Sequence, residues 1–252
     1  MSGHSKWSTI KHGKAVTDAR RGKLFTKLTR EIITAARQGG GNPDMNIRLR
    51  MAVQKARDNN MPTDNVDRAI KRGTGEGSGQ DQMTEATYEG YAPGGTAILL
   101  QTLTDNPRRT VSDIRSTFTK AGGNLGEAGS VAWQFEQKGV LIVEADPERA
   151  EELALAAIDA GADEFDTFDS TLHVESAPEM MEEVRKTLAA LDVSIESSEL
   201  AMVPKSTVAL EKPVALQTLH LLDLLEELDD VQKVFSNADF PDEALEQYKG
   251  EA

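Results

Sequence analysis

The sequence predicts an α+β protein of three domains: a small N-terminal helical bundle followed by two ferredoxin-like α/β domains, one inserted into the other. Three observations carry this prediction. The first is a break in charge: residues 1–75 hold 16 Lys and Arg against 6 Asp and Glu, whereas the rest of the chain holds 12 against 36. The second is the helical spacing of apolar residues before residue 75, and the third is an alternation of strand and helix patterns after residue 83.

Three helices are expected in the basic segment. The first follows from apolar residues at helical spacing before the glycines at 39–41, which end it. Asn42 is expected to cap the second helix, which carries Met45 on its apolar face. The third is expected to begin at Thr63 and to end at Gly73. Three short helices of this kind form a small bundle.

The acidic remainder reads as two βαββαβ units. Residues 139–202 give the order strand, helix, strand, strand, helix, strand, which is the split βαβ pattern of a ferredoxin-like domain. The patterns before residue 139 and those after residue 202, taken together, repeat this order, provided that residues 130–136 form a strand. The expected division is a basic helical domain at 1–75, a discontinuous outer α/β domain at 83–137 and 204–240, an inserted ferredoxin-like domain at 138–203, a linker at 73–82 and a frayed acidic tail at 241–252.

The glycine-rich stretch RGTGEGSGQDQ separates the two charge regimes. A phosphate-binding loop needs a strand before it, and a lysine and a helix after it. Here a helical pattern comes before the glycines, and Gln, Asp and Gln follow them. The sequence therefore favours a flexible linker over a phosphate loop.

The first helix predicts a basic stripe opposite its apolar face. Lys23, Lys27, Arg30 and Arg37 fall in one sector, and only Glu31 lies near it. A solvated helix face normally mixes charges, and like charges three or four residues apart repel each other. A phosphate backbone would compensate this repulsion, so nucleic acid is favoured over plain solvent. The second and third helices give a weaker directional signal; their cations are Arg48, Arg50, Lys55, Arg57, Arg68, Lys71 and Arg72.

The arm GHSKWSTIKHGKAVTDARRGK extends the basic region toward the N-terminus. Trp7 either stacks on a base or anchors the arm to the bundle. His4 and His12 have poor spacing for a metal site, so no metal is expected. The expected nucleic-acid-binding residues are Lys6, Trp7, Lys11, His12, Lys14, Arg20, Arg21, Lys23, Lys27, Arg30 and Arg37.

The sequence predicts no catalytic residue, no cofactor and no small-molecule substrate. The chain has no Cys, and His173 and His220 fit core or edge positions. Arg108 and Arg109 open a helix, where they either pair with neighbouring acids or make a second phosphate contact. The N-terminus is polar and no apolar run approaches the roughly 18 residues of a membrane helix, so we expect a cytoplasmic protein.

Several motifs resemble the YebC/PmpR family over most of the chain. They are GHSKWSTIKHGKAVTDARRGKLFTKLTREI, NMPTDNVDRAIKRGTGEG, YEGYAPGGTAIL, TDNPRRTVSDIRSTFTKAGGNLGEAGSVAWQF and VFSNADF. The resemblance implies a helical N-terminal domain and two α/β domains, one inserted in the other. Members are usually described as DNA-binding transcriptional regulators. Others, including the mitochondrial translational activator of cytochrome c oxidase, resemble ribosome-associated factors that help translation through proline runs.

Three functions remain open at this point. The first is a non-enzymatic DNA-binding transcriptional regulator, although no clear helix-turn-helix spacing is found. The alternative is a ribosome-associated translation factor that binds ribosomal RNA and relieves stalling. The third is an interaction module whose basic arm docks on an acidic partner, including the acidic domains of this chain.

Overall fold

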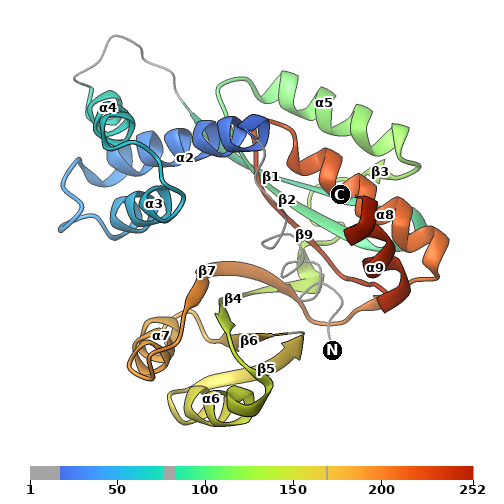
Figure 1. Cartoon of the computed structure of the whole chain (residues 1–252). Coiled ribbons are helices and arrows are strands. Elements are labelled where there is room, and N and C mark those ends of the chain that lie inside the picture. Colours follow the sequence, from blue (N-terminus) through green and yellow to red (C-terminus); the bar gives the residue numbers. More distant parts are fainter. Residues whose placement is uncertain (1–17, 76–82, 169, 252) are drawn as a thin grey trace.

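The computed structural model describes residues 18–75, 83–168 and 170–251. These residues form three groups: an N-terminal set of helices, a sheet with helices on one face, and a second sheet with its own pair of helices (Figure 1). The α+β fold class expected from the sequence is confirmed.

The N-terminal group consists of α2 (Asp18–Gly39), α3 (Ile47–Asp58) and α4 (Thr63–Gly73). Their shared core is aliphatic because each helix turns one apolar stripe inward. Gly73 allows α4 to approach α2 closely: a Cβ at this position would lie 2.6 Å from the Cβ of Ala36 and 2.6 Å from the carbonyl oxygen of Ile33. The buried residues of this core are Leu28, Ile32, Ile33, Ala35, Ala36, Leu49, Ala52, Val53, Ala56, Met61, Val66 and Ala69.

The connection between α2 and α3 differs from the expectation. Asn46, and not Asn42, caps α3: its side-chain oxygen accepts the backbone N–H three residues ahead at 3.0 Å. The Asn46 amide also donates to the carbonyls of Ala35 at 2.8 Å and Gly40 at 2.9 Å, which ties the start of α3 to the end of α2. Met45 therefore lies before the helix and is 84% exposed, so its expected place on the apolar face is wrong.

The first sheet combines segments that are far apart in the sequence. Its strand order is β3-β1-β2-β9, and every neighbouring pair is antiparallel. Ile98 and Leu100 on the central strand face a core shared with the helices, while Leu99 faces the opposite side. The elements are β1 (Thr84–Tyr91), β2 (Ala97–Thr104), α5 (Pro107–Lys120), β3 (Asn124–Leu125), α8 (Lys212–Glu226), β9 (Val231–Ser236) and α9 (Asp242–Glu251), together with β8 (Val208–Ala209) and β10 (Ala238–Asp239), which pair with each other in parallel.

The acidic tail is helical, and the expected fraying is wrong over α9. Ala244, Leu245 and Tyr248 are buried in the same core as α8. They lie within one turn of a helix and share a face. This short apolar face explains why the tail is ordered despite its acidic composition.

The second sheet is formed by one continuous stretch of chain. Its strand order is β5-β6-β4-β7, again fully antiparallel, with α6 and α7 on one face (Figure 1). This is the βαββαβ order of a ferredoxin-like unit. Because strands from before and after this stretch share the first sheet, we propose the inserted domain at 138–203 and the outer domain at 83–137 and 204–240. The elements are β4 (Phe135–Glu144), α6 (Pro147–Asp159), β5 (Ala162–Phe168), β6 (Thr171–Ser176), α7 (Met181–Ala189) and β7 (Ile195–Pro204).

The strand expected at 130–136 does not form. It begins with a bend and continues as the short 3-10 helix η2 (Ala132–Gln134), and only its last two residues are extended, as the beginning of β4. The cause is Glu89, whose carboxylate accepts the backbone N–H groups of Gly129 at 2.6 Å, Val131 at 2.6 Å and Ala132 at 2.8 Å. These groups are then unavailable to a sheet. Burial opposes ionisation of Glu89, but the three donors outweigh it and lower its pKa.

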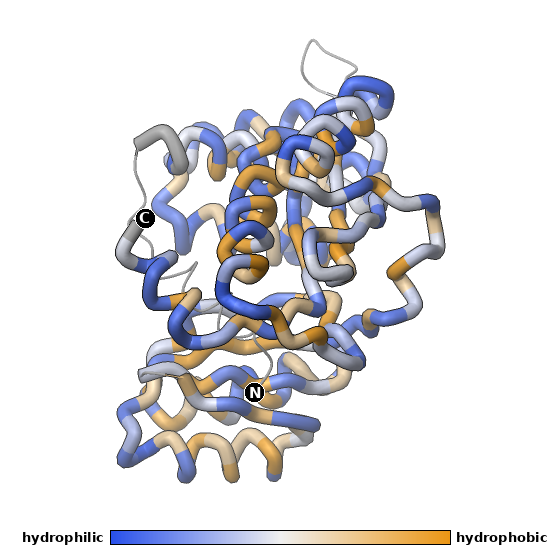
Figure 2. Tube along the Cα trace, turned by 90° about the vertical axis from the view of Figure 1, so that its right-hand side faces the viewer, coloured by the Kyte–Doolittle hydropathy of each residue, from blue (hydrophilic) through white to orange (hydrophobic). Residues whose placement is uncertain are grey.

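Hydrophobic and hydrophilic residues are interspersed along the helices and strands, as expected for elements that each bury one face (Figure 2). None of the helices described combines the length and the apolar character needed to cross a bilayer.

Candidate nucleic-acid interface

The residues expected to bind nucleic acid are only partly described by the structure. Lys6, Trp7, Lys11, His12 and Lys14 lie outside the described residues, and Arg20 is described only as part of the α2 backbone. The other five all lie on α2; they are Arg21, Lys23, Lys27, Arg30 and Arg37.

The first part of α2 lies against the turn between α8 and β9, which we call the acidic turn (residues 226–230). The Lys27 ammonium donates to the backbone carbonyl of Glu226 at 2.5 Å. This carbonyl belongs to the last residue of α8, where the helix dipole favours a positive charge. Lys23 lies 3.7 Å from a carboxylate oxygen of Glu227. Both lysines thus satisfy groups at the end of a helix from another domain.

Arg30 makes the most buried of these contacts. Its guanidinium donates to the backbone carbonyl of Asp229 and to the carboxylate of Asp230, the latter at 2.8 Å. The side chain of Arg30 is 16% exposed and that of Asp230 is 7% exposed. Exposed ion pairs add little stability, but one this buried resists displacement by salt or by another anion.

Asp230 also anchors the start of α5. Its carboxylate accepts hydrogen bonds from Arg109 at 2.9 Å and from the hydroxyl of Thr110 at 2.8 Å. Burial would raise the pKa of Asp230, but these donors and the charge of Arg30 outweigh it and lower the pKa. Arg109 also pairs with Asp105 at 2.8 Å. Of the two alternatives for Arg109, pairing with neighbouring acids is the one present in the structure.

Lys23, Lys27 and Arg30 of the α2 stripe therefore contact the acidic part of the same chain. This is the kind of contact that the third function assigned to the basic arm, most of which lies outside the described residues. Helical periodicity correctly placed Lys23, Lys27 and Arg30 on a side away from the apolar core. It carried no information on what lies across from that side. The role of these residues toward nucleic acid stays a prediction.

A second ionic contact joins three parts of the fold. Glu199 on β7 lies 2.8 Å from the ammonium of Lys55 on α3 and 3.1 Å from that of Lys233 on β9. Burial opposes the charge on Glu199, but the two lysines outweigh it and lower its pKa. Arg48 on α3 reaches Glu85 on β1 at 2.6 Å. Sequence reasoning missed both contacts because their partners come from distant segments of the chain.

Two of the histidines singled out in the sequence, His173 and His220, lie in the described part of the chain. His173 is buried on β6, where burial lowers its pKa to about 4, so it is neutral at physiological pH. A carboxylate oxygen of Glu175 lies 3.8 Å from the imidazole Nδ1. In the described ranges, no three His, Asp or Glu side chains lie together as a metal ion would require.

Two family models match the chain in succession. The model described as the TACO1/YebC protein N-terminal domain matches residues 5–76, and the model described as the TACO1/YebC second and third domain matches residues 83–238. The boundary between the two matches falls within the glycine-rich segment.

Relatives align over nearly the whole chain. A probable transcriptional regulatory protein of Dehalococcoides mccartyi strain 195 is 53% identical over 252 residues and covers 100% of both chains. One of Rubrobacter xylanophilus is 51% identical over 250 residues and covers 99% of this chain and 100% of its own. The crystal structure of a conserved hypothetical protein, Aq1575, from Aquifex aeolicus is 47% identical, has a TM-score of 0.85, and covers 94% of this chain and 97% of its own. The chain belongs to the TACO1/YebC family.

Proposed function

We propose that this protein is a non-enzymatic regulator of gene expression that binds nucleic acid through its basic N-terminal segment, as a DNA-binding transcriptional regulator. The observation that carries the proposal is the segregation of charge, +10 in residues 1–75 against −24 in the remainder. A polyanion binds most tightly to a concentrated basic segment, because each phosphate that is neutralised releases condensed counterions. The names of the relatives support the same class of function.

Nucleic acid would compete with the acidic turn for part of the α2 stripe. Lys23 and Glu227 have side chains 43% and 56% exposed, and an ion pair this exposed contributes about 0–1 kcal/mol. Phosphates can replace such a contact at little cost. The buried pair of Arg30 and Asp230 is held more firmly, so the exchange begins at the N-terminal end of α2.

One observation favours the second candidate, a ribosome-associated factor that binds ribosomal RNA. Helices α3 and α4 are joined by four residues, as in a helix-turn-helix, in which the second helix enters the major groove. The first half of α4, however, exposes Asp64 and Asp67. Carboxylates at these positions would face the phosphates that line the groove. This arrangement argues against insertion of α4 into a major groove and thereby favours an unpaired strand, such as a loop of ribosomal RNA, over duplex DNA.

The two candidates are separated by crosslinking the full chain to nucleic acid in cells and sequencing what is recovered. Sequence-selective protection of duplex DNA, without co-sedimentation with ribosomes, supports the transcriptional regulator. Crosslinks confined to ribosomal RNA support the translation factor. Failure to bind duplex, single strand or ribosome at about 0.15 M salt overturns both.

The role of the stripe is tested with the double variant Lys23→Gln/Lys27→Gln. We expect a weaker dependence of affinity on salt, by about 0.9 in the log–log slope for each lost contact to duplex phosphate. Arg185→Gln is the matched control, because Arg185 pairs with Glu182 within the inserted domain. An unchanged slope in the double variant would remove these two lysines from the interface.

A further inference from the structure

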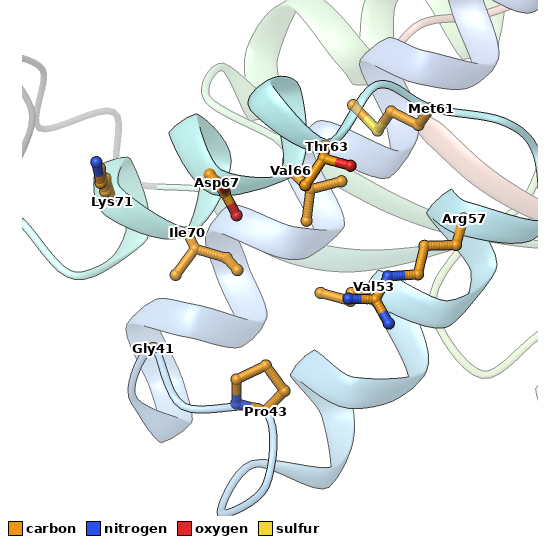
Figure 3. Close-up of a pocket in the computed structure, with 10 residues that line it drawn as sticks. All are labelled: Gly41, Pro43, Val53, Arg57, Met61, Thr63, Val66, Asp67, Ile70 and Lys71. Atoms are coloured by element: carbon orange, nitrogen blue, oxygen red, sulfur yellow. The ribbon is translucent and has the colours of Figure 1, made fainter.

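A groove of about 330 Å³ opens between α3 and α4 on the N-terminal domain (Figure 3). Its floor is apolar: Val53 and Val66 are buried beneath it, and Ile70 and Pro43 are half-buried at its surface. Figure 3 shows Val66 and Ile70 on α4 directed toward Val53 on α3. The volume lies at the lower end of small-ligand sites, which fits one ring system and not an extended ligand.

The shape of the groove depends on a close backbone approach at one end. A Cβ on Gly41 would lie 2.7 Å from a methyl of Thr74 and 3.2 Å from a methyl of Ile70. The absence of a side chain at Gly41 thus lets the α2–α3 connection pass beside Ile70. The end wall of the groove is therefore backbone, and the floor remains open.

Two uncommitted cations stand at the ends of the groove. Arg57 lies at one end and Lys71 at the other (Figure 3). Both are exposed, and neither side chain forms a hydrogen bond or an ion pair within 18–75, 83–168 and 170–251. In this they differ from Arg48 and Lys55, which are paired with carboxylates of the other domains. Asp67 adds one carboxylate to the same lining.

An apolar floor between two cations matches the chemistry of a nucleotide. A base offers a flat apolar face, and the phosphates on its two sides carry the charge that Arg57 and Lys71 can meet. The Asp67 carboxylate can accept an N–H from the Watson–Crick edge of such a base. A duplex keeps its bases stacked inside, so only an unpaired nucleotide can enter.

We propose that the α3–α4 groove holds one unpaired nucleotide of a single-stranded nucleic acid, with its base against Val53, Val66 and Ile70 and its phosphates on Arg57 and Lys71. This inference rests on the proposed function and adds a second contact surface, separate from the α2 stripe. It requires no movement of the basic domain, because both cations are already exposed.

The test uses the full chain and three fluorescently labelled 12-nucleotide probes of one sequence: a single strand, the same strand with abasic sites, and the duplex. Each is made as RNA and as DNA. Anisotropy titrations give the affinity and its salt dependence. We expect the wild type to prefer the base-containing single strand over the abasic strand by about tenfold, the effect of burying roughly 55 Å² of apolar base surface against the aliphatic floor.

Two variants assign this preference to the groove. Arg57→Gln/Lys71→Gln should reduce the log–log salt slope for the single strand by about 1.4, the effect of two phosphate contacts. Ile70→Ala should remove apolar surface from the groove and weaken the preference for bases, while it leaves abasic binding unchanged. Arg68→Gln is the control, because Arg68 lies on α4 outside the groove lining and bonds Asn65. Circular dichroism checks that each variant is folded.

The outcomes separate this inference from the proposed function. If the wild type binds none of the probes and no ribosome, the proposed function fails. If the wild type binds nucleic acid but treats abasic and base-containing strands alike, or if both groove variants bind as wild type does, the groove inference alone is overturned. A groove-dependent preference for either RNA or DNA supports it and identifies the kind of strand.

Discussion

Replacing Asp230 with Ala removes a carboxylate that accepts hydrogen bonds from four side chains. Arg30, Arg109, Thr104 and Thr110 all donate to it, and Asp230 is 5% exposed. Removing one partner of a buried ion pair costs about 3–5 kcal/mol, because the remaining charge is left without compensation. Arg109 is half-exposed and can regain water, so the expected cost extends below the lower end of this range. We expect the free energy of unfolding to fall by about 2–4 kcal/mol.

The assay is thermal unfolding of the full chain, followed by calorimetry and by circular dichroism. For a chain of this size, the expected loss lowers the melting temperature by about 5–15 °C. Asp229→Ala is the matched control, because Asp229 is exposed and Arg30 contacts its backbone carbonyl, which the variant retains. A shift for Asp230→Ala no larger than that for Asp229→Ala would refute the reasoning.

The pH dependence of the unfolding free energy gives a second test of the role of Asp230. The pKa of Asp230 is lowered in the fold, so the folded state binds fewer protons than the unfolded state near the ordinary Asp pKa. Its stabilisation is therefore complete above about pH 4 and is lost as the pH falls through the lowered pKa. We expect the difference in stability between wild type and Asp230→Ala to stay constant from pH 5 to 8 and to shrink below about pH 4.

Two further predictions concern the cores. Burial lowers the pKa of His173 to about 4, so between pH 6.5 and 4 the unfolded chain binds a proton that the folded chain does not. Stability therefore falls as the pH is lowered through this window, and His173→Gln should reduce that fall by up to about 1.4 kcal/mol per pH unit. Equal pH profiles of unfolding free energy for the two proteins would contradict this. Gly73→Ala should destabilise the basic domain by about 1–3 kcal/mol because its Cβ would meet Ala36 at 2.6 Å. Gly22→Ala is the control in the same helical bundle, because its Cβ would meet nothing within 4 Å; it should stabilise the domain by up to about 1 kcal/mol. Denaturant unfolding followed by circular dichroism measures the stability change of each variant. A change of the same sign in both variants would exclude the packing explanation.

The sequence predicted those parts of the fold that depend on local pattern. The ferredoxin-like unit was found because its helices and strands follow each other within about 65 residues and each has its own periodicity. The cap of α3 was not predicted, because Asn42 and Asn46 have equal propensity. Only the bonds of Asn46 to Ala35 and Gly40 decide between them.

The errors lie where tertiary contacts outweigh local pattern. The stretch 130–136 has the composition of a strand, but Glu89, some 40 residues earlier, takes its N–H groups. The tail at 242–251 is too short to be a stable helix alone, and it is helical because Leu245 and Tyr248 join a core built by other segments. The partner of the α2 stripe could not be predicted for the same reason, because Lys27 and Glu226 are 199 positions apart in the sequence.

The division of the cations into paired and uncommitted sets gives the proposed binding an order. A strand approaching the basic domain meets Arg57 and Lys71 first, because no contact within the described residues has to break. The exchange at Lys23 and Lys27 replaces a carboxylate and a backbone carbonyl of the acidic turn by phosphates, so part of the gain is offset by the contacts that are lost. Its effect is also to release the first part of α2 from the acidic turn, while Arg30 still holds Asp230. Binding at the groove would therefore set the affinity, and exchange at the stripe would couple binding to the position of the basic domain on the acidic body.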